Sequence, residues 1–128
     1  PRLGGNFGKA LLHAAKGCLK PEDIVVTDQV AATVIVASGG YPGDYEKGKE
    51  IKGSGIGDQG SGETIVFHCG TKAEGERILT SGGRVLSVTG LGANLREAVD
   101  RAYARIGAIS FDKMFYRKDI AHRAFERG

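Results

Sequence analysis

The sequence predicts a small α+β domain in which helices pack on one face of a mainly antiparallel sheet. Three observations support this fold class. They are one long amphipathic helical pattern, several short runs rich in β-branched residues, and 21 glycines spread along 128 residues, as many tight turns require. Hydrophobic residues make up 41% of the chain and charged residues 26%, which is ordinary for one folded globular domain.

The clearest element is a helix from Leu95 to Ile106, whose apolar residues recur at helical spacing and form one stripe. Asn94, followed by Glu97, resembles a capping box at the start of this helix, and Gly107 is placed to end it. A shorter helix is predicted from Phe7 to Lys16 by the same kind of spacing. The two helices supply the apolar faces that cover the sheet.

Runs of β-branched residues predict the strands. The run 33–36 is continuous rather than alternating, so we expect a strand that is buried on both faces. The connection 70–76 contains glycine and is expected to join strands 64–69 and 77–80 as a hairpin. The predicted strands are 24–27, 32–37, 50–52, 64–69, 77–80, 84–89 and 109–111, and one helical turn is expected within 116–128.

The first candidate site is a glycine-rich turn that directly follows the strand 32–37. Glycines leave backbone N–H groups accessible, and successive N–H groups form anion-binding concavities, while tyrosine adds a hydroxyl and a stacking face. The turn is not a P-loop, because no Gly-Lys-Ser/Thr follows at the required spacing. A purely structural turn is the alternative. The residues are Ser38, Gly39, Gly40, Tyr41, Pro42 and Gly43, with Lys47 within reach.

The second candidate site lies at the start of the strand 84–89. Ser81, Gly82, Gly83 and Arg84 combine a hydroxyl, two glycines and a guanidinium, whose fork of donors fits phosphate oxygens. We expect this turn to lie close to the first one and to face the same cleft. The alternative is a bulged hairpin turn with a solvated arginine.

Other residue types point to no catalytic or metal site. The three histidines share no spacing, and no paired carboxylates or Ser/His/Asp order is recognisable. Cys18 and Cys69 lie far apart and form no C-x-x-C pair, so free thiols are expected. A net charge of +3 suits a small anionic ligand without demanding nucleic acid.

In their order and spacing, these motifs resemble the glycinamide ribonucleotide synthetases, which are ATP-grasp ligases of purine biosynthesis. The resemblance rests on three longer motifs, 34–45, 80–86 and 115–120, and on the shorter groups 47–48, 50–51, 66–68, 70–72, 88–89 and 123–124. It covers roughly residues 7–127. It implies the α+β fold of the C-terminal domain of ATP-grasp ligases, where turns of this type help to bind the substrate phosphate.

The resemblance also implies an activity. In the family, ATP phosphorylates the carboxylate of glycine, and the amine of 5-phosphoribosylamine attacks the acyl phosphate to form an amide. ATP and magnesium are bound mainly upstream of this region, so neither is expected to bind this chain alone. The implied partners are the two substrates and the N-terminal and ATP-grasp domains of the same protein, with no nucleic acid and no membrane. A cytoplasmic location is expected because the sequence has no apolar run long enough to span a bilayer and no signal-peptide pattern.

The start of the chain departs from the family pattern. The family carries Arg-x-Gly-Asp-Pro-Glu before the first helix, whereas this chain has Pro1-Arg2-Leu3-Gly4-Gly5 and lacks those carboxylates. We therefore expect residues 1–30 to be the end of an ATP-grasp domain with its connection, and residues 31–128 to be the substrate-binding domain. Alone, the chain should be inactive. The alternatives are a structural domain without ligand, or a small nucleic-acid-binding module.

Overall fold

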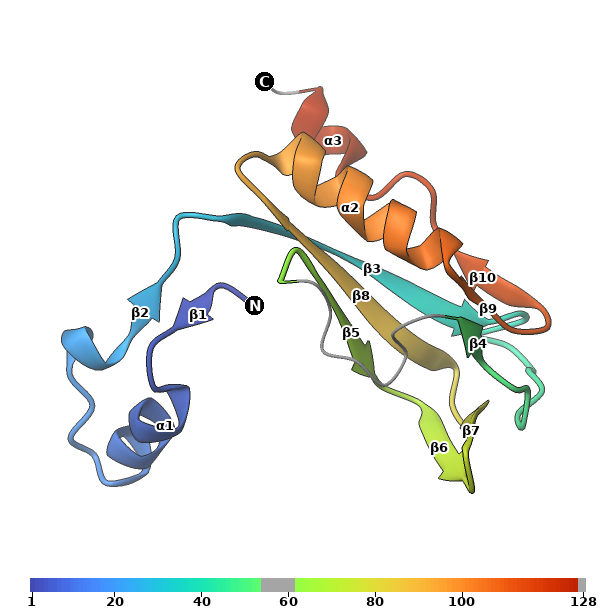
Figure 1. Ribbon diagram of the computed structural model, residues 1–128, viewed down its shortest axis with the longest axis horizontal. Helices are drawn as coiled ribbons and strands as arrows, with labels where there is room; N and C mark the ends of the chain where they lie inside the picture. Colours follow the sequence, from blue (N-terminus) through green and yellow to red (C-terminus); the bar gives the residue numbers. More distant parts are fainter. Residues whose placement is uncertain (54–61, 127–128) are drawn as a thin grey trace.

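A computed structural model describes residues 1–53 and 62–126 of the chain (Figure 1). Its centre is a four-stranded antiparallel sheet of order β10-β3-β8-β5, one face of which is covered by the helix α2. The predicted α+β class is therefore confirmed. The strands of this sheet are β3 (Val30–Ser38), β5 (Thr64–His68), β8 (Arg84–Gly92) and β10 (Met114–Tyr116), and the helix α2 is Leu95–Gly107.

Shorter elements surround this centre. The strand pairs are β4 with β9 and β6 with β7, and a single helical turn, α3, follows β10. Their bounds are β4 (Lys52–Gly53), β6 (Thr71–Glu74), β7 (Arg77–Thr80), β9 (Ile109–Ser110) and α3 (His122–Phe125). The expected short strand at 50–52 is present in part, since Glu50 forms an isolated bridge with Leu79.

The helix α2 forms where its apolar stripe and its caps predict it. The Asn94 side chain accepts a hydrogen bond from the Glu97 amide at 3.0 Å, while the Glu97 carboxylate accepts from the Ala93 amide at 2.7 Å. The expected capping box is thus shifted by one residue on its carboxylate side. Glu97 also pairs with Arg101 one turn later, at 2.8 Å.

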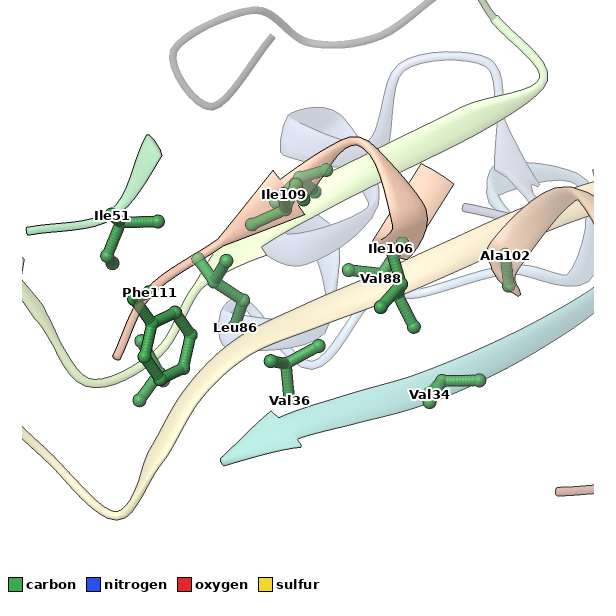
Figure 2. Close-up of a cluster of buried hydrophobic side chains, with 11 residues drawn as sticks. Val34, Val36, Ile51, Leu86, Val88, Ala102, Ile106, Ile109 and Phe111 are labelled. Carbon is green, nitrogen blue, oxygen red and sulfur yellow. The ribbon is translucent and has the colours of Figure 1, made fainter. Parts of the chain in front are cut away.

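The core lies between α2 and the sheet (Figure 2). Val34 and Val36 of β3 and Val88 of β8 are fully buried, and they meet Ile106 of α2, which is also fully buried. This packing shows that the expected burial of the run 33–36 on both faces is wrong. The strand β3 is buried on one face only, because α2 covers one side and leaves Thr33 and Ile35 exposed on the other.

The expected hairpin between 64–69 and 77–80 is also wrong. Strand β5 pairs with β8, from Thr64 opposite Gly90 to His68 opposite Leu86. The residues Thr71–Glu74 are extended and form the strand β6, which pairs with β7 across a tight turn at Gly75. The hairpin is therefore a separate two-stranded unit that projects beyond the end of the main sheet (Figure 1).

Residues 1–26 form a separate N-terminal unit. It consists of β1 (Leu3–Gly4), α1 (Phe7–Ala15), the 3₁₀ turn η1 (Pro21–Asp23) and β2 (Val25–Val26), with β1 paired to β2. The His13 ring and the Asp23 carboxylate, 2.7 Å apart, link α1 to η1. In Figure 1 this unit lies to one side of the main sheet, to which the chain connects through the start of β3.

Candidate functional site

The two predicted turns meet at one edge of the molecule. Strands β3 and β8 are antiparallel, so the end of β3 lies beside the start of β8, with Ala37 opposite Arg84. The Ser38 amide donates to the Gly83 carbonyl at 2.8 Å, and the Ser38 hydroxyl donates to the Gly82 carbonyl at 3.0 Å. These bonds hold the Ser38–Gly43 turn against the Ser81–Arg84 turn, as their positions in the sequence predict.

Tyr41 and Arg84 make the main side-chain contact between the turns. Arg84 Nη1 donates to the Tyr41 hydroxyl at 3.0 Å, and the guanidinium carbon lies 5.8 Å from the centre of the Tyr41 ring. Tyr45 packs edge-on against the same ring, with centroids 5.9 Å apart. The Tyr41 hydroxyl thus orients the Arg84 guanidinium, while Tyr45 packs against the Tyr41 ring.

Gly83 makes room for this contact. A Cβ atom at position 83 would lie 2.0 Å from Cδ2 of Tyr41, which is far closer than any packed carbon contact. The absence of a side chain at Gly83 therefore allows the Tyr41 ring to lie flat on the second turn. This requirement is specific to the pair and is not a general preference for glycine in turns.

The expectation of many free backbone N–H groups is wrong for most of the two turns. The amide of Gly39 donates to the carbonyl of Lys113 at 2.7 Å, and the amides of Ser81 and Gly82 both donate to Gly70. The Ser38 and Tyr41 amides are also bonded within the turns. Side chains, rather than an amide nest, are therefore the main source of positive charge at this site.

The neighbouring lysines differ in their availability. Lys49 pairs with Glu46 at 2.6 Å and with Asp112 at 3.1 Å, and Lys113 pairs with Glu46 at 3.0 Å. Hydrogen bonds from Lys49 and then Lys113 lower the pKa of Glu46 from 4.5 to about 2. Lys47 instead lies 5.9 Å from the Tyr45 ring and, like Arg84, has no carboxylate partner within the described residues.

A groove of about 260 Å³ begins at the Tyr41–Arg84 contact and runs over the face of the sheet that α2 does not cover. Ile35 of β3 and Phe115 of β10 supply apolar walls, and Ile120 closes one side. Arg117 also lines the groove, but its Nε and Nη2 donate to the Asp119 carboxylate at 2.9 and 2.6 Å. Among the described residues that line the groove, Arg84 is therefore the cation without a carboxylate partner, whereas Arg117 is paired with Asp119.

Sequence reasoning missed the groove itself. Successive side chains of β3 point to opposite faces, which exposes Ile35, but the unbroken run of β-branched residues gives no sign of this. Nothing in the sequence around Phe115 indicates a site. The motif 115–120 was nevertheless one of the three that carried the family resemblance. All three of those motifs, 34–45, 80–86 and 115–120, contribute residues to this one groove.

Neither a metal site nor a membrane span is found in the part of the chain that the structure describes. Residues 1–53 and 62–126 contain no group of three or more His, Cys, Asp or Glu side chains placed to hold a metal ion. No helix among these residues is long and apolar enough to cross a bilayer.

Comparison with known proteins gives one consistent result. Residues 31–123 match the family described as phosphoribosylglycinamide synthetase, C domain. The chain is 41% identical over 124 residues to a phosphoribosylamine–glycine ligase of Chlorobaculum tepidum, and 39% identical over 124 residues to a bifunctional purine biosynthetic protein of Schizosaccharomyces pombe. Each match covers 97% of this chain.

A solved structure agrees with these relatives. The crystal structure of the phosphoribosylamine–glycine ligase of Thermotoga maritima superposes with a TM-score of 0.73 at 34% identity, over 90% of this chain and 27% of that one. The chain covers 29% of the Chlorobaculum protein and 15% of the Schizosaccharomyces protein, so it corresponds to a minor part of each relative. By sequence and by fold, the chain belongs to the phosphoribosylglycinamide synthetase C domain family.

Proposed function

We propose that this chain is the C-terminal part of a ligase that joins glycine to 5-phosphoribosylamine, and that it supplies the side of the active site that binds the substrate phosphate. The observation that carries the proposal is the convergence of three separate motifs on the groove that begins at Tyr41 and Arg84. The three motifs lie on the neighbouring strands β10, β3 and β8, and side chains from all three line one open groove, as a ligand site would require.

Arg84 is the residue proposed to bind the phosphate. A guanidinium has five N–H donors, and the Tyr41 hydroxyl uses one of them, which leaves the remainder of the fork for phosphate oxygens. Tyr41 accepts that hydrogen bond and thereby holds the guanidinium at the mouth of the groove. Lys47, whose Nζ lies 5.9 Å from the Tyr45 ring, is proposed as a second cation of the site, and Tyr41 with Pro42 is proposed to line the ribose.

The same comparisons support the expected division of the chain at residue 30. The family match begins at residue 31, yet the Chlorobaculum relative matches 97% of the chain, so most of residues 1–30 also has a counterpart in that ligase. We propose that residues 1–30 belong to the adjoining ATP-grasp part of the longer protein. The separate position of the N-terminal unit in Figure 1 supports this division.

ATP and magnesium belong to the proposed reaction but are assigned to other parts of the longer protein. When bound there, ATP supplies the phosphoryl group that activates glycine. The residues of this chain bind and orient the phosphoribosylamine phosphate, which brings the amine to the activated carboxylate. A cytoplasmic location accompanies this proposal.

The isolated 128-residue chain is expected to have no ligase activity, because it would supply only one side of the active site. The measurement is ADP release by the purified chain with ATP, magnesium, glycine and phosphoribosylamine, compared with the full-length ligase under the same conditions. Substrate-dependent ADP release by the chain alone would show that it carries the catalytic groups as well.

In the full-length ligase, Arg84→Ala is expected to raise the KM for phosphoribosylamine and to leave the KM for ATP nearly unchanged. Losing charge-assisted hydrogen bonds to a phosphate costs about 2–3 kcal/mol, which is about 30- to 150-fold in affinity. Steady-state kinetics with each substrate varied in turn measures both constants.

Two variants control for this test. Arg77→Ala removes an exposed arginine from strand β7, outside the groove, and should leave both constants unchanged. Arg84→Lys keeps the charge but loses the fork of donors, so it should fall between wild type and Arg84→Ala. Equal increases in both KM values for Arg84→Ala, or none in either, would remove Arg84 from the phosphate site.

A further inference from the structure

The strand β8 is irregular where it meets the end of β3. The two strands pair in regular register over most of their length, and the last regular pair is Val36 with Leu86. The next pair is Ala37 with Arg84, so Val85 is left over between the two pairs. One extra residue in one strand of an antiparallel pair is a β-bulge.

The bulge decides which face of the sheet Arg84 occupies. Successive residues of a strand point to opposite faces, and Leu86, two positions after Arg84, is fully buried in the core beneath α2. In a regular strand Arg84 would therefore face the core as well. Because Val85 is extra, Arg84 instead lies opposite Ala37, and both residues line the groove on the other face. Val85 itself is fully buried in the same core cluster as Leu86.

The chain that follows β5 holds the bulge in place. The amides of Cys69 and Gly70 both donate to the Val85 carbonyl, at 3.0 and 3.1 Å. The Gly70 carbonyl in turn accepts from the amides of Ser81 and Gly82, at 2.8 and 3.1 Å. Gly70 is thus bonded to the backbone on both sides of the arginine.

Gly70 lies too close to this backbone for any side chain to fit at position 70. A Cβ atom there would lie 2.6 Å from the Arg84 carbonyl oxygen, 2.7 Å from Gly82 Cα and 2.9 Å from the Gly82 nitrogen. All three are backbone atoms, which cannot rotate away as the end of a flexible side chain can. A methyl group at position 70 would therefore displace the backbone that carries Arg84.

The direction of the Arg84 guanidinium is sensitive to such a displacement. Its hydrogen bond to the Tyr41 hydroxyl is 3.0 Å long. A side-chain hydrogen bond is lost beyond roughly 3.5 Å. Carbon atoms in contact lie about 3.5–4.0 Å apart, so relieving the contacts of a methyl group at position 70 requires a shift of about 1 Å. That shift is enough to break the bond that holds the guanidinium at the mouth of the groove.

We propose that Gly70 and the bulge at Val85 are positioning residues that direct Arg84 into the groove. This inference rests on the proposed function, in which Arg84 binds the substrate phosphate. Gly70 belongs to the short motif 70–72 and is not among the described residues that line the groove. Its effect on the substrate is therefore indirect and passes through the direction of the guanidinium.

The test is Gly70→Ala in the full-length ligase, with the KM of each substrate measured in turn. The KM for phosphoribosylamine is expected to rise on the order of tenfold or more, because a misdirected guanidinium loses its bonds to the phosphate. The KM for ATP should not change. Partial unfolding would give a different result, since it lowers the amount of active enzyme, and so the apparent kcat, while both KM values stay the same.

Gly75→Ala is the matched control. It also adds one methyl group, in the β6–β7 turn, where the methyl group meets no atom within 4 Å. Gly75 has a φ of +60°, so alanine there strains the neighbouring hairpin without displacing the Arg84 backbone. Both KM values should be those of wild type.

A double-mutant cycle shows whether Gly70 acts through Arg84. Adding Gly70→Ala to Arg84→Ala should change the KM for phosphoribosylamine by less than about twofold, because the residue that Gly70 positions is already gone. Gly82→Ala, whose Cβ would lie 3.1 Å from Gly70 Cα, is a milder form of the same displacement and replaces Gly70→Ala in the cycle if that variant does not fold. A full additional effect in the Arg84→Ala background, or an unchanged KM in both glycine variants, would overturn the proposal.

Hydrogen exchange tests the bonds of Gly70 without any substrate. The amides of Ser81 and Gly82 donate to the Gly70 carbonyl, so the peptide 80–86 should exchange faster in Gly70→Ala than in wild type. Unchanged exchange would contradict the positioning role. Failure of this proposal is distinguishable from failure of the proposed function. If Arg84→Ala raises the KM for phosphoribosylamine and Gly70→Ala does not, the positioning role is excluded and the phosphate site remains, whereas an unchanged KM in Arg84→Ala would overturn both.

Discussion

Replacing Gly90 with alanine is expected to lower the free energy of unfolding of the chain by about 3 kcal/mol, at the upper end of the usual cost of overpacking. Gly90 lies in β8, directly beneath α2. A Cβ atom there would lie 2.1 Å from the Ala98 carbonyl oxygen and 2.7 Å from the Ala102 nitrogen. Both are backbone atoms of the helix, so relief would require the whole helix to move away from the sheet.

Urea denaturation followed by circular dichroism measures this loss, provided that the slope of the transition is unchanged. Gly107→Ala is the matched control, because it also adds one methyl group, in the last residue of α2, and meets no atom within 4 Å. The control should be neutral or slightly stabilising. A Gly90→Ala protein as stable as wild type would mean that α2 is not seated on β8 as described.

Ile106→Ala is expected to cost about 2–5 kcal/mol, because it leaves a cavity in the centre of the core. Ile106 is fully buried and packs in one cluster with Leu86, Val88 and Ile109 (Figure 2). These neighbours come from β8 and β9, so they cannot all move inward to fill the space.

Two comparisons define the cavity effect. Ile106→Val removes one methylene and should cost about 0.5–1.5 kcal/mol, measured in the same way. Leu11→Ala removes a side chain that is 55% exposed, on α1, and should cost little. If Leu11→Ala were as costly as Ile106→Ala, the chain would have a larger core that includes the N-terminal unit.

The helices could be predicted from the sequence because their signals are local. Asn6 and Asn94 each cap the helix that follows, and both helices begin and end within a residue or so of the expected positions. What the stripe on α1 packs against could not be predicted. Its Phe7 and Leu11 are exposed although their spacing is that of a buried face, because the chain offers that face no partner among the described residues.

Strand positions were predictable, whereas strand pairing was not. Thr71–Glu74 is too polar to be distinguished from a loop, and it becomes the strand β6 because Gly75 turns it onto β7. The run 33–36 has the composition of a strand buried on both faces. Its true one-sided burial depends on which faces α2 covers, and that is decided by contacts between distant segments.

The candidate site, too, could be predicted only in part from the sequence. The proximity of Tyr41 and Arg84 follows from two motifs at the ends of neighbouring antiparallel strands. The loss of free amides could not be foreseen, because Gly39 donates to Lys113 and Ser81 to Gly70, partners that no local pattern links to the turns. The contribution of Phe115 to the groove likewise depends on the pairing of β10 with β3.

The contact between Tyr41 and Gly83 also constrains how the protein can change over evolutionary time. With the Tyr41 ring in its present position, no side chain fits at position 83, since the first carbon of that side chain would lie within 2.4 Å of two ring atoms. A side chain gained at position 83 would force the ring to move, whereas loss of the ring creates no clash. The two positions, 42 residues apart in sequence, are therefore expected to vary together, and a lineage that loses the ring no longer needs the glycine for this contact.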